Sequence, residues 1–372
     1  MIRIRNLKHC SGCMACLRAC QSSAITTYYE NGFAYPRADS RKCVDCGRCE
    51  AVCPYLHSMS TSVVEGAYIA YTEESLRQYS SAGGVFAVLA LRTLASGGAV
   101  FGAAYNDDGT CSHRCIVDAD ELFALMGRKY VESEIGDCYA RAKELLLEER
   151  DVLFSGTPCQ IAGLKRYLGA PYPRLLTVEV GCGGVAGEDV WNSFLSLMGD
   201  PVKVEITNRA DEDNRAAIRF VYEDGLEKIL SRKDTEIHKA ITQGLGIRPS
   251  CENCAMGRKK SAADITLRRY NPALDDNALN IRRQPMTMAL CRTAAGRRAL
   301  AESASLLTVR EISREDAYRH MNRAEKEKRF AERSGAFIKS LAVMPFDEAL
   351  DKYSRRSLVD RIAKAVRSLF VK

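Results

Sequence analysis

Two cysteine-rich stretches near the start of the chain constrain its fold more than any other feature. The first runs Cys10-Ser-Gly-Cys13-Met-Ala-Cys16-Leu-Arg-Ala-Cys20, and the second runs Cys43-Val-Asp-Cys46-Gly-Arg-Cys49-Glu-Ala-Val-Cys53-Pro54. Both have the spacing C-x-x-C-x-x-C-x-x-x-C, typical of 4Fe-4S clusters, and in paired-cluster proteins the fourth cysteine ligates the other cluster. We therefore expect one 4Fe-4S cluster on Cys10, Cys13, Cys16 and Cys53, and a second on Cys20, Cys43, Cys46 and Cys49.

Structural zinc and a disulfide framework are the alternatives for these cysteines. Zinc sites usually combine two C-x-x-C pairs separated by a longer loop, whereas here four cysteines fall within eleven residues, twice. No apolar segment of a secretion signal precedes Cys10, so we expect reduced thiols in the cytoplasm. The spacing therefore favours two clusters.

The size and charge of the chain limit its class. Its 372 residues, of which 46% are hydrophobic, predict a globular protein of two or three domains. A net charge of +7, without an interleaved basic and aromatic stretch, does not indicate nucleic-acid binding. We expect an α/β fold, α+β overall, with a ferredoxin-type dicluster domain at 1–57, a mixed α/β domain at 67–300 and a helical C-terminal segment at 301–372.

A serine- and glycine-rich stretch opens an expected helix at 86–94. Free backbone N–H groups at such a helix start suit a phosphate, although a simple helix cap is the alternative. The run Ala99–Tyr105 that follows is typical of a buried strand. The candidate ligand-binding residues here are Ser80, Ser81, Gly83, Gly84 and Val85.

Two later strands, expected at 151–155 and 175–180, each lead through a turn into a helix and carry a cysteine in the turn. Cys159 follows the first strand and Cys182 the second, which indicates parallel strands. Ligands of parallel sheets gather at the carboxyl ends of the strands. A further pair, Cys251 and Cys254, completes a set of four thiols. From spacing alone, this set leaves open a third cluster, structural zinc or no metal.

Other motifs carry weaker signals. Cys111 and Cys115 flank His113 on one strand face, which suits either a metal site or ordinary strand cysteines. Cys138 and Cys291 are expected to be packing residues. The C-terminal stretch 354–372 predicts a basic amphipathic helix, which suits peripheral contact with the inner membrane surface, the protein core or a partner.

Six stretches taken together resemble one family, the beta subunits of hydrogenases and dehydrogenases that use coenzyme F-420, a deazaflavin. They occur in the family's order between about residues 75 and 300. The stretches are Ser80-Ser-Ala-Gly-Gly-Val85, Gly127-Arg-Lys-Tyr-Val-Glu-Ser133, Leu153-Phe-Ser-Gly-Thr-Pro-Cys-Gln-Ile-Ala-Gly-Leu164, Cys182-Gly-Gly-Val185, Arg248-Pro-Ser-Cys251-Glu-Asn-Cys254 and Ala263-Asp-Ile-Thr-Leu267.

The resemblance implies cofactors and site residues. It implies a third 4Fe-4S cluster on Cys159, Cys182, Cys251 and Cys254. It also implies a flavin, usually FAD, near the helix start at Ser80–Val85, with Lys129, Thr157 and Gln160 among the cofactor-binding residues. The sequence departs from the family after Leu267, where Arg268-Arg-Tyr-Asn-Pro272 replaces the usual Gly-Asp-Phe-Trp-Gly.

The function that follows is an iron–sulfur flavoprotein oxidoreductase. Electrons would pass between the ferredoxin-type clusters and a flavin, which reduces or oxidises a deazaflavin or another small organic substrate. The expected protein partner is a ferredoxin or a redox subunit. The alternative is a non-enzymatic electron-transfer subunit of a larger redox complex. The sequence identifies no general acid or base and no specific substrate.

Overall fold

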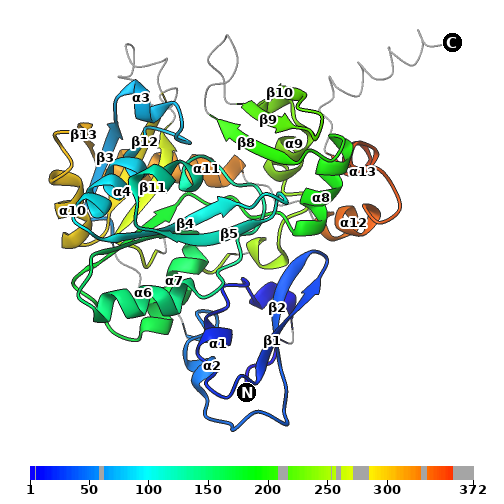
Figure 1. The fold of residues 1–372 in the computed structure, drawn as a ribbon, viewed down its shortest axis with the longest axis horizontal. Coiled ribbons are helices and arrows are strands. Elements are labelled where there is room, and N and C mark those ends of the chain that lie inside the picture. Colours follow the sequence, from blue (N-terminus) through cyan, green and yellow to red (C-terminus); the bar gives the residue numbers. More distant parts are fainter. Residues whose placement is uncertain are drawn as a thin grey trace.

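The structure is a computed structural model that describes residues 1–4, 6–57, 63–207, 217–252, 254–256, 261–270, 285–327 and 333–354. A small cysteine-rich module projects from a larger body in which helices cover a wide sheet (Figure 1). The C-terminal basic helix expected at 354–372 lies outside the described residues apart from its first position. Among the described residues, no helix combines the length and the apolar character needed to cross a membrane.

The cysteine-rich module combines short helices with one hairpin. The antiparallel strands β1 and β2 pair from Ile25 with Ala38 to Glu30 with Phe33, as the Asn31-Gly32 turn predicts. Both turn residues have positive φ, 54° and 72°, which this tight turn requires. The elements are a 3-10 turn at Leu7–His9, α1 (Ala15–Arg18), β1 (Ile25–Glu30), β2 (Phe33–Ala38) and α2 (Arg48–Ala51).

The body is built on an eight-stranded mixed sheet in the order β13-β3-β12-β11-β7-β6-β4-β5. Strands β4, β6, β7 and β11 are mutually parallel, which confirms the parallel strands expected from the two strand-turn-helix units. The remaining pairs are antiparallel. The bounds are β3 (Gly66–Tyr71), β4 (Ala99–Tyr105), β5 (Cys111–Ile116), β6 (Val152–Gly156), β7 (Leu175–Val180), β11 (Ile265–Tyr270), β12 (Met286–Cys291) and β13 (Thr308–Ile312).

Helices pack on both faces of this sheet. Along β4 and β6, Val100 and Leu153 pack with α4, whereas Phe101 and Phe154 pack with α6 and α7. Successive strand residues point to opposite faces, so two apolar cores form and confirm the α/β class. The helices are α3 (Glu74–Arg77), α4 (Val85–Ala95), α5 (Leu122–Leu125), α6 (Cys138–Leu147), α7 (Pro158–Leu168), α10 (Ala294–Ala301) and α11 (Arg314–Glu327).

A second lobe packs around Trp191, which is fully buried. Its aromatic core includes Phe194, Phe220 and Phe346, and the ring of Phe194 contacts the other two in edge-to-face geometry. The segment beyond residue 300 therefore joins two parts of the body, through β13 in the sheet and α13 in this lobe. The elements are α8 (Glu188–Leu197), β8 (Lys203–Thr207), β9 (Ala217–Val221), β10 (Glu227–Ser231), α9 (Glu236–Thr242), α12 (Ser334–Ser340) and α13 (Phe346–Tyr353).

Candidate iron–sulfur and flavin site

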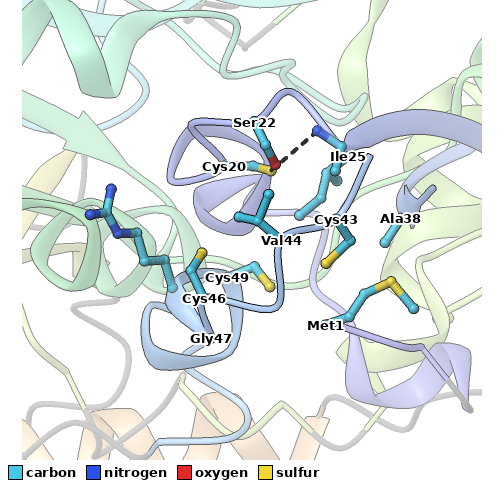
Figure 2. A pocket seen from close by; sticks show the side chains of 12 residues that line it. Met1, Cys20, Ser22, Ile25, Ala38, Cys43, Val44, Cys46, Gly47 and Cys49 are labelled. Carbon is cyan, nitrogen blue, oxygen red and sulfur yellow. Dashed lines mark hydrogen bonds between the residues drawn. The ribbon is translucent and has the colours of Figure 1, made fainter. Parts of the chain in front are cut away.

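The predicted ligands of the second cluster surround one small pocket in the cysteine-rich module. Cys20, Cys43, Cys46 and Cys49 all line it, together with apolar side chains such as Val44 (Figure 2). Backbone N–H groups already point at two of the sulfurs, because Ala24 donates to Cys20 Sγ and Ile2 to Cys49 Sγ, each at 3.3 Å. Such N–H···S bonds are one of the ways in which a protein tunes cluster potential.

The predicted ligands of the first cluster also lie together. Burial raises the pKa of Cys16, and the neighbouring Cys13, Cys10 and Cys53 raise it further. Thiolates affect one another in this way only when they are close, because like charges disfavour ionisation at short range. Cys53 therefore lies near the cysteines of the first stretch, and Cys20 lies near those of the second. This exchange of the fourth cysteine is typical of paired clusters.

The main cavity of the body has a volume of about 330 Å³. It opens at the carboxyl ends of β6, β7 and β11, the edge at which parallel sheets bind ligands. At the end of β6, Thr157 and Gln160 form a reciprocal capping box that starts α7, and this box holds Cys159 in the first helical turn. At the end of β7, the chain turns directly into Gly181 and Cys182.

Most residues predicted for the flavin and for a third cluster line this one cavity. The predicted residues among its lining are Ser80, Ser81, Gly84, Val85, Lys129, Thr157, Cys159, Gln160, Cys182, Cys251 and Cys254. Gly83 is absent from the lining. Its N–H donates to Thr287 Oγ1 at 2.8 Å, and a Cβ at this position would overlap the Ala70 carbonyl. Gly83 therefore permits close contact between the loop and the sheet.

The four cysteines of the cavity form a third mutual group. Burial raises the pKa of Cys159 well above its usual value, and Cys182, Cys254 and Cys251 add to the rise. Two sulfurs have polar neighbours: Thr157 Oγ1 lies 3.2 Å from Cys159 Sγ, and the Gly184 N–H lies 3.4 Å from Cys182 Sγ.

The donor set suits a multi-iron cluster. The cavity cysteines border open volume, as a cubane requires, because each thiolate ligates a different iron.

Lys129 and its neighbours make the cavity electropositive. The Lys129 ammonium donates to the backbone carbonyls of Ala124 and Met126, and burial lowers the pKa of Lys129 to about 8. Among the described lining residues, Glu132 is the one acidic side chain. The basic side chains of the lining are Arg128, Lys129, Arg248, Arg268 and Arg269. Such a lining suits an anionic ligand.

His113 is a cavity residue that the sequence did not identify as such. Its Nδ1 lies 2.7 Å from Ser133 Oγ and its Nε2 lies 3.1 Å from the Ser155 carbonyl oxygen. Burial lowers the pKa of His113 to about 4, so the ring is neutral at pH 7. Cys111 and Cys115 instead pack in two separate apolar cores, as ordinary strand cysteines do. Side chains alternate between the two faces along β5, and this alternation is the sequence signal that could have identified His113 as facing inward.

The cysteine-rich module lies directly against the cavity. Ser11, Gly12 and Tyr55 of the module contribute to its lining, and the Tyr55 hydroxyl lies 3.5 Å from the Ser250 carbonyl. A Cβ at Gly163, one turn after Cys159 on α7, would lie 3.1 Å from Cys13 Sγ. The first cysteine set is therefore adjacent to the set in the cavity.

Two parts of the chain match known families. Residues 9–56 match the 4Fe-4S dicluster domain, and residues 149–315 match the family described as the C terminus of the coenzyme F420 hydrogenase/dehydrogenase beta subunit. These matches confirm the resemblance predicted from the motifs. The dicluster domain implies two 4Fe-4S clusters and a role in electron transfer.

Comparison with solved structures supports the fold. A chain from the xenon-derivatised F420-reducing NiFe hydrogenase complex of Methanosarcina barkeri aligns with a TM-score of 0.50 at 14% sequence identity. The alignment covers 72% of this chain and 91% of that chain. No curated protein sequence matches. The two molecules therefore share a fold.

Proposed function

We propose that the chain, whose residues 9–56 match the 4Fe-4S dicluster domain and whose residues 149–315 match the coenzyme F420 hydrogenase/dehydrogenase beta subunit family, is an iron–sulfur flavoprotein oxidoreductase. One observation carries the proposal. The four cavity cysteines and all but one of the predicted flavin residues line the same cavity at the carboxyl edge of the parallel strands. A cluster and a flavin in this cavity would be close enough to exchange electrons.

The third 4Fe-4S cluster is proposed on Cys159, Cys182, Cys251 and Cys254. Support comes from the closeness of the four thiols, since the other three raise the pKa of Cys159. Polar groups also face two of the sulfurs. The α7 capping box holds Cys159 in place, and the Gly184 N–H offers a hydrogen bond that would stabilise negative charge on Cys182.

The flavin is proposed at the N-terminus of α4. The backbone N–H groups of this 11-residue helix begin after Gly84, whose φ of 83° is a left-handed conformation that glycine adopts easily. Ser80 and Ser81 add hydroxyl groups, and Lys129 adds a cation beside a group that would carry phosphates. A bound flavin would convert single electrons from the clusters into a two-electron or hydride transfer to an organic substrate.

The placement of the three cysteine sets supports an order of electron flow. Cys46 of the second set is exposed, and the neighbouring Val44 is 71% exposed. The first set lies between this outer pocket and the cavity, because Cys13 contacts α7 at Gly163. Electrons from a protein partner would enter at the second cluster, pass to the first, and reach the third cluster beside the flavin.

The proposed partners are a ferredoxin or a redox subunit on the protein side and a small organic molecule on the substrate side. The matched structure comes from a hydrogenase complex that reduces F420, so a deazaflavin is one candidate substrate. If the chain carried electrons only to another protein, it would act as a redox subunit without a substrate of its own.

Cys182→Ser tests the proposed third cluster, with Cys138→Ser as a matched control at a buried cysteine outside the three sets. After anaerobic purification, Cys182→Ser should hold about four iron atoms fewer than the wild type, because one cubane is lost. Cys138→Ser should keep the wild-type iron content. Reduction of the bound flavin by a one-electron donor should also slow at least tenfold in Cys182→Ser. Equal iron content in all three proteins would refute the third cluster.

A further inference from the structure

A buried ion pair of the body lies where the body meets the cysteine-rich module. Arg248 is 1% exposed, and its Nη2 lies 2.6 Å from Glu132 Oε2, whose side chain is 17% exposed. Burial opposes charge on Arg248, but Glu132 beside it raises the pKa of the guanidinium, so Arg248 remains charged. Taking an ion pair out of water is costly, so a pair at this depth needs further favourable contacts.

Those contacts come from the cysteine-rich module. Arg248 Nη1 donates to the Cys10 carbonyl at 3.1 Å, and Nη2 donates to the Ala34 carbonyl at 2.8 Å. The guanidinium also lies 5.0 Å from the ring of Phe33 and 4.6 Å from that of Tyr35, within cation–π range. Lysine cannot reproduce this geometry, because it lacks a planar guanidinium that donates several hydrogen bonds while lying beside two aromatic rings.

The backbone of the first cysteine stretch is shaped around this side chain. A Cβ at Gly12, between Cys10 and Cys13, would overlap the Arg248 guanidinium. Gly12 also has a φ of 68°, which favours glycine independently. The loop that carries the first cysteine set is therefore fitted to Arg248.

Arg248 lies near both cysteine sets. Its guanidinium donates a hydrogen bond to the carbonyl of Cys10, a residue of the first set. Arg248 also lines the same cavity as Cys251, which lies three residues after it in the chain. The buried Arg248 Nε has no hydrogen-bond partner among the described residues. A buried N–H left in this way is costly unless a bound group accepts it.

We propose that Arg248 is a positioning residue for electron transfer between the first and third clusters. The guanidinium fixes the Cys10 loop against the cavity, and its charge stabilises the reduced state of both clusters. Each electron that arrives adds one negative charge to a cluster, and a fixed positive charge in a low-dielectric site favours that state. In the proposed transfer, one electron would leave the first cluster and one would reach the third, with no bond made or broken. The inference rests on the third cluster of the proposed function.

The test compares redox titrations, followed by electron paramagnetic resonance, of the wild type and the double variant Arg248→Gln/Glu132→Gln. The double variant removes both charges, so no unpaired charge stays buried. At a fixed potential, the reduced-to-oxidised ratio of the first and third clusters should fall at least tenfold, which is 59 mV for a one-electron couple. The second cluster should titrate unchanged and serves as an internal reference. The matched control is Arg92→Gln/Glu302→Gln, which removes another Arg–Glu pair joining α4 and the end of α10.

The inference would be overturned if the double variant held as much iron as the wild type and its clusters had wild-type reduction potentials. If the double variant loses iron, the single variant Arg248→Lys is tested in its place. Lysine keeps the positive charge but lacks the planar guanidinium that donates several hydrogen bonds. Stopped-flow reduction of the third cluster of this variant should then slow about tenfold while the potentials stay close to wild type, and a wild-type rate would equally overturn the inference. A wild-type protein with about eight irons would instead remove the third cluster and with it the proposed function. The first-cluster potential would still report the effect of Arg248 separately.

Discussion

Lys129 is a partly buried cation whose hydrogen bonds go to the carbonyls of Ala124 and Met126 rather than to a carboxylate. Burial lowers the pKa of Lys129 to about 8, below the usual value near 10.4. An anionic flavin phosphate nearby would favour the charged form and raise this pKa. Protonated Lys129 should therefore strengthen flavin binding below pH 8.

The corresponding prediction concerns flavin affinity against pH. In the flavin-free protein, Lys129 loses its proton as the pH rises through about 8, so the affinity should fall above that pH. Lys129→Met should bind flavin about tenfold more weakly at pH 7 and show no such fall. Quenching of flavin fluorescence on titration with flavin-free protein measures both quantities. Lys228→Met, on exposed strand β10, is the control, and a wild-type pH profile in Lys129→Met would contradict the assignment.

At the residue scale, the two N-terminal cysteine sets were predictable because their spacing is typical of 4Fe-4S clusters, whereas the cavity set was predicted only through the family resemblance. The structure places Cys20, Cys43, Cys46 and Cys49 around one pocket and Cys159, Cys182, Cys251 and Cys254 around another, and their roles as cluster ligands remain predictions. His113 and the Arg248 contacts were not predictable, because they depend on partners distant in sequence, such as Ser133 and Cys10. Gly83 was assigned to the flavin but serves the contact with Thr287.

At the level of elements, α7 links two cysteine sets. It carries Cys159 in its first turn, and a Cβ added at its Gly163 would lie 3.1 Å from Cys13 Sγ of the module, closer than ordinary packing. The helix ends at Gly169, whose φ of 74° is the left-handed conformation in which glycine commonly terminates helices. Helix α7 therefore sets how closely the first cluster can approach the cavity.

Gly163→Ala should separate the first cysteine set from α7. The new Cβ would lie 3.0 Å from the Tyr139 hydroxyl and 3.1 Å from Cys13 Sγ, which is tighter than ordinary packing. We expect a destabilisation of about 1–3 kcal/mol. Iron release under mild denaturation should be faster, and the thermal midpoint of the anaerobic protein should fall.

The control for this variant is Gly335→Ala, in α12. A Cβ at Gly335 meets no atom within 4 Å, so alanine should stabilise this helix by about 0.5–1 kcal/mol. If Gly163→Ala retained iron and melted like Gly335→Ala, α7 would not be in close contact with the first cysteine set.

Local patterns predicted several elements well, including β4 and β7 at the bounds observed. These strands form apolar runs between clear turn signals. The order of the sheet was not predictable, since β3 pairs with both β12 and β13, which lie more than two hundred residues later in the chain. Such pairings depend on tertiary packing rather than on local sequence.

At the scale of the whole molecule, the central feature is a succession of three cysteine sets. It runs from an exposed pocket in the module, past α7, to a cavity at the carboxyl edge of the main sheet. The dicluster domain accounts for the outer two sets. The proposed function adds a third cluster and a flavin in the cavity, which would make the molecule a converter between one-electron and two-electron chemistry.

The most direct test of this account is the cofactor content of the anaerobically purified wild-type chain, measured by iron, sulfide and flavin assays with a visible spectrum. We predict about twelve irons and one flavin per chain, since three cubanes need four irons each. About eight irons without flavin would contradict the account and leave a chain that only carries electrons between proteins.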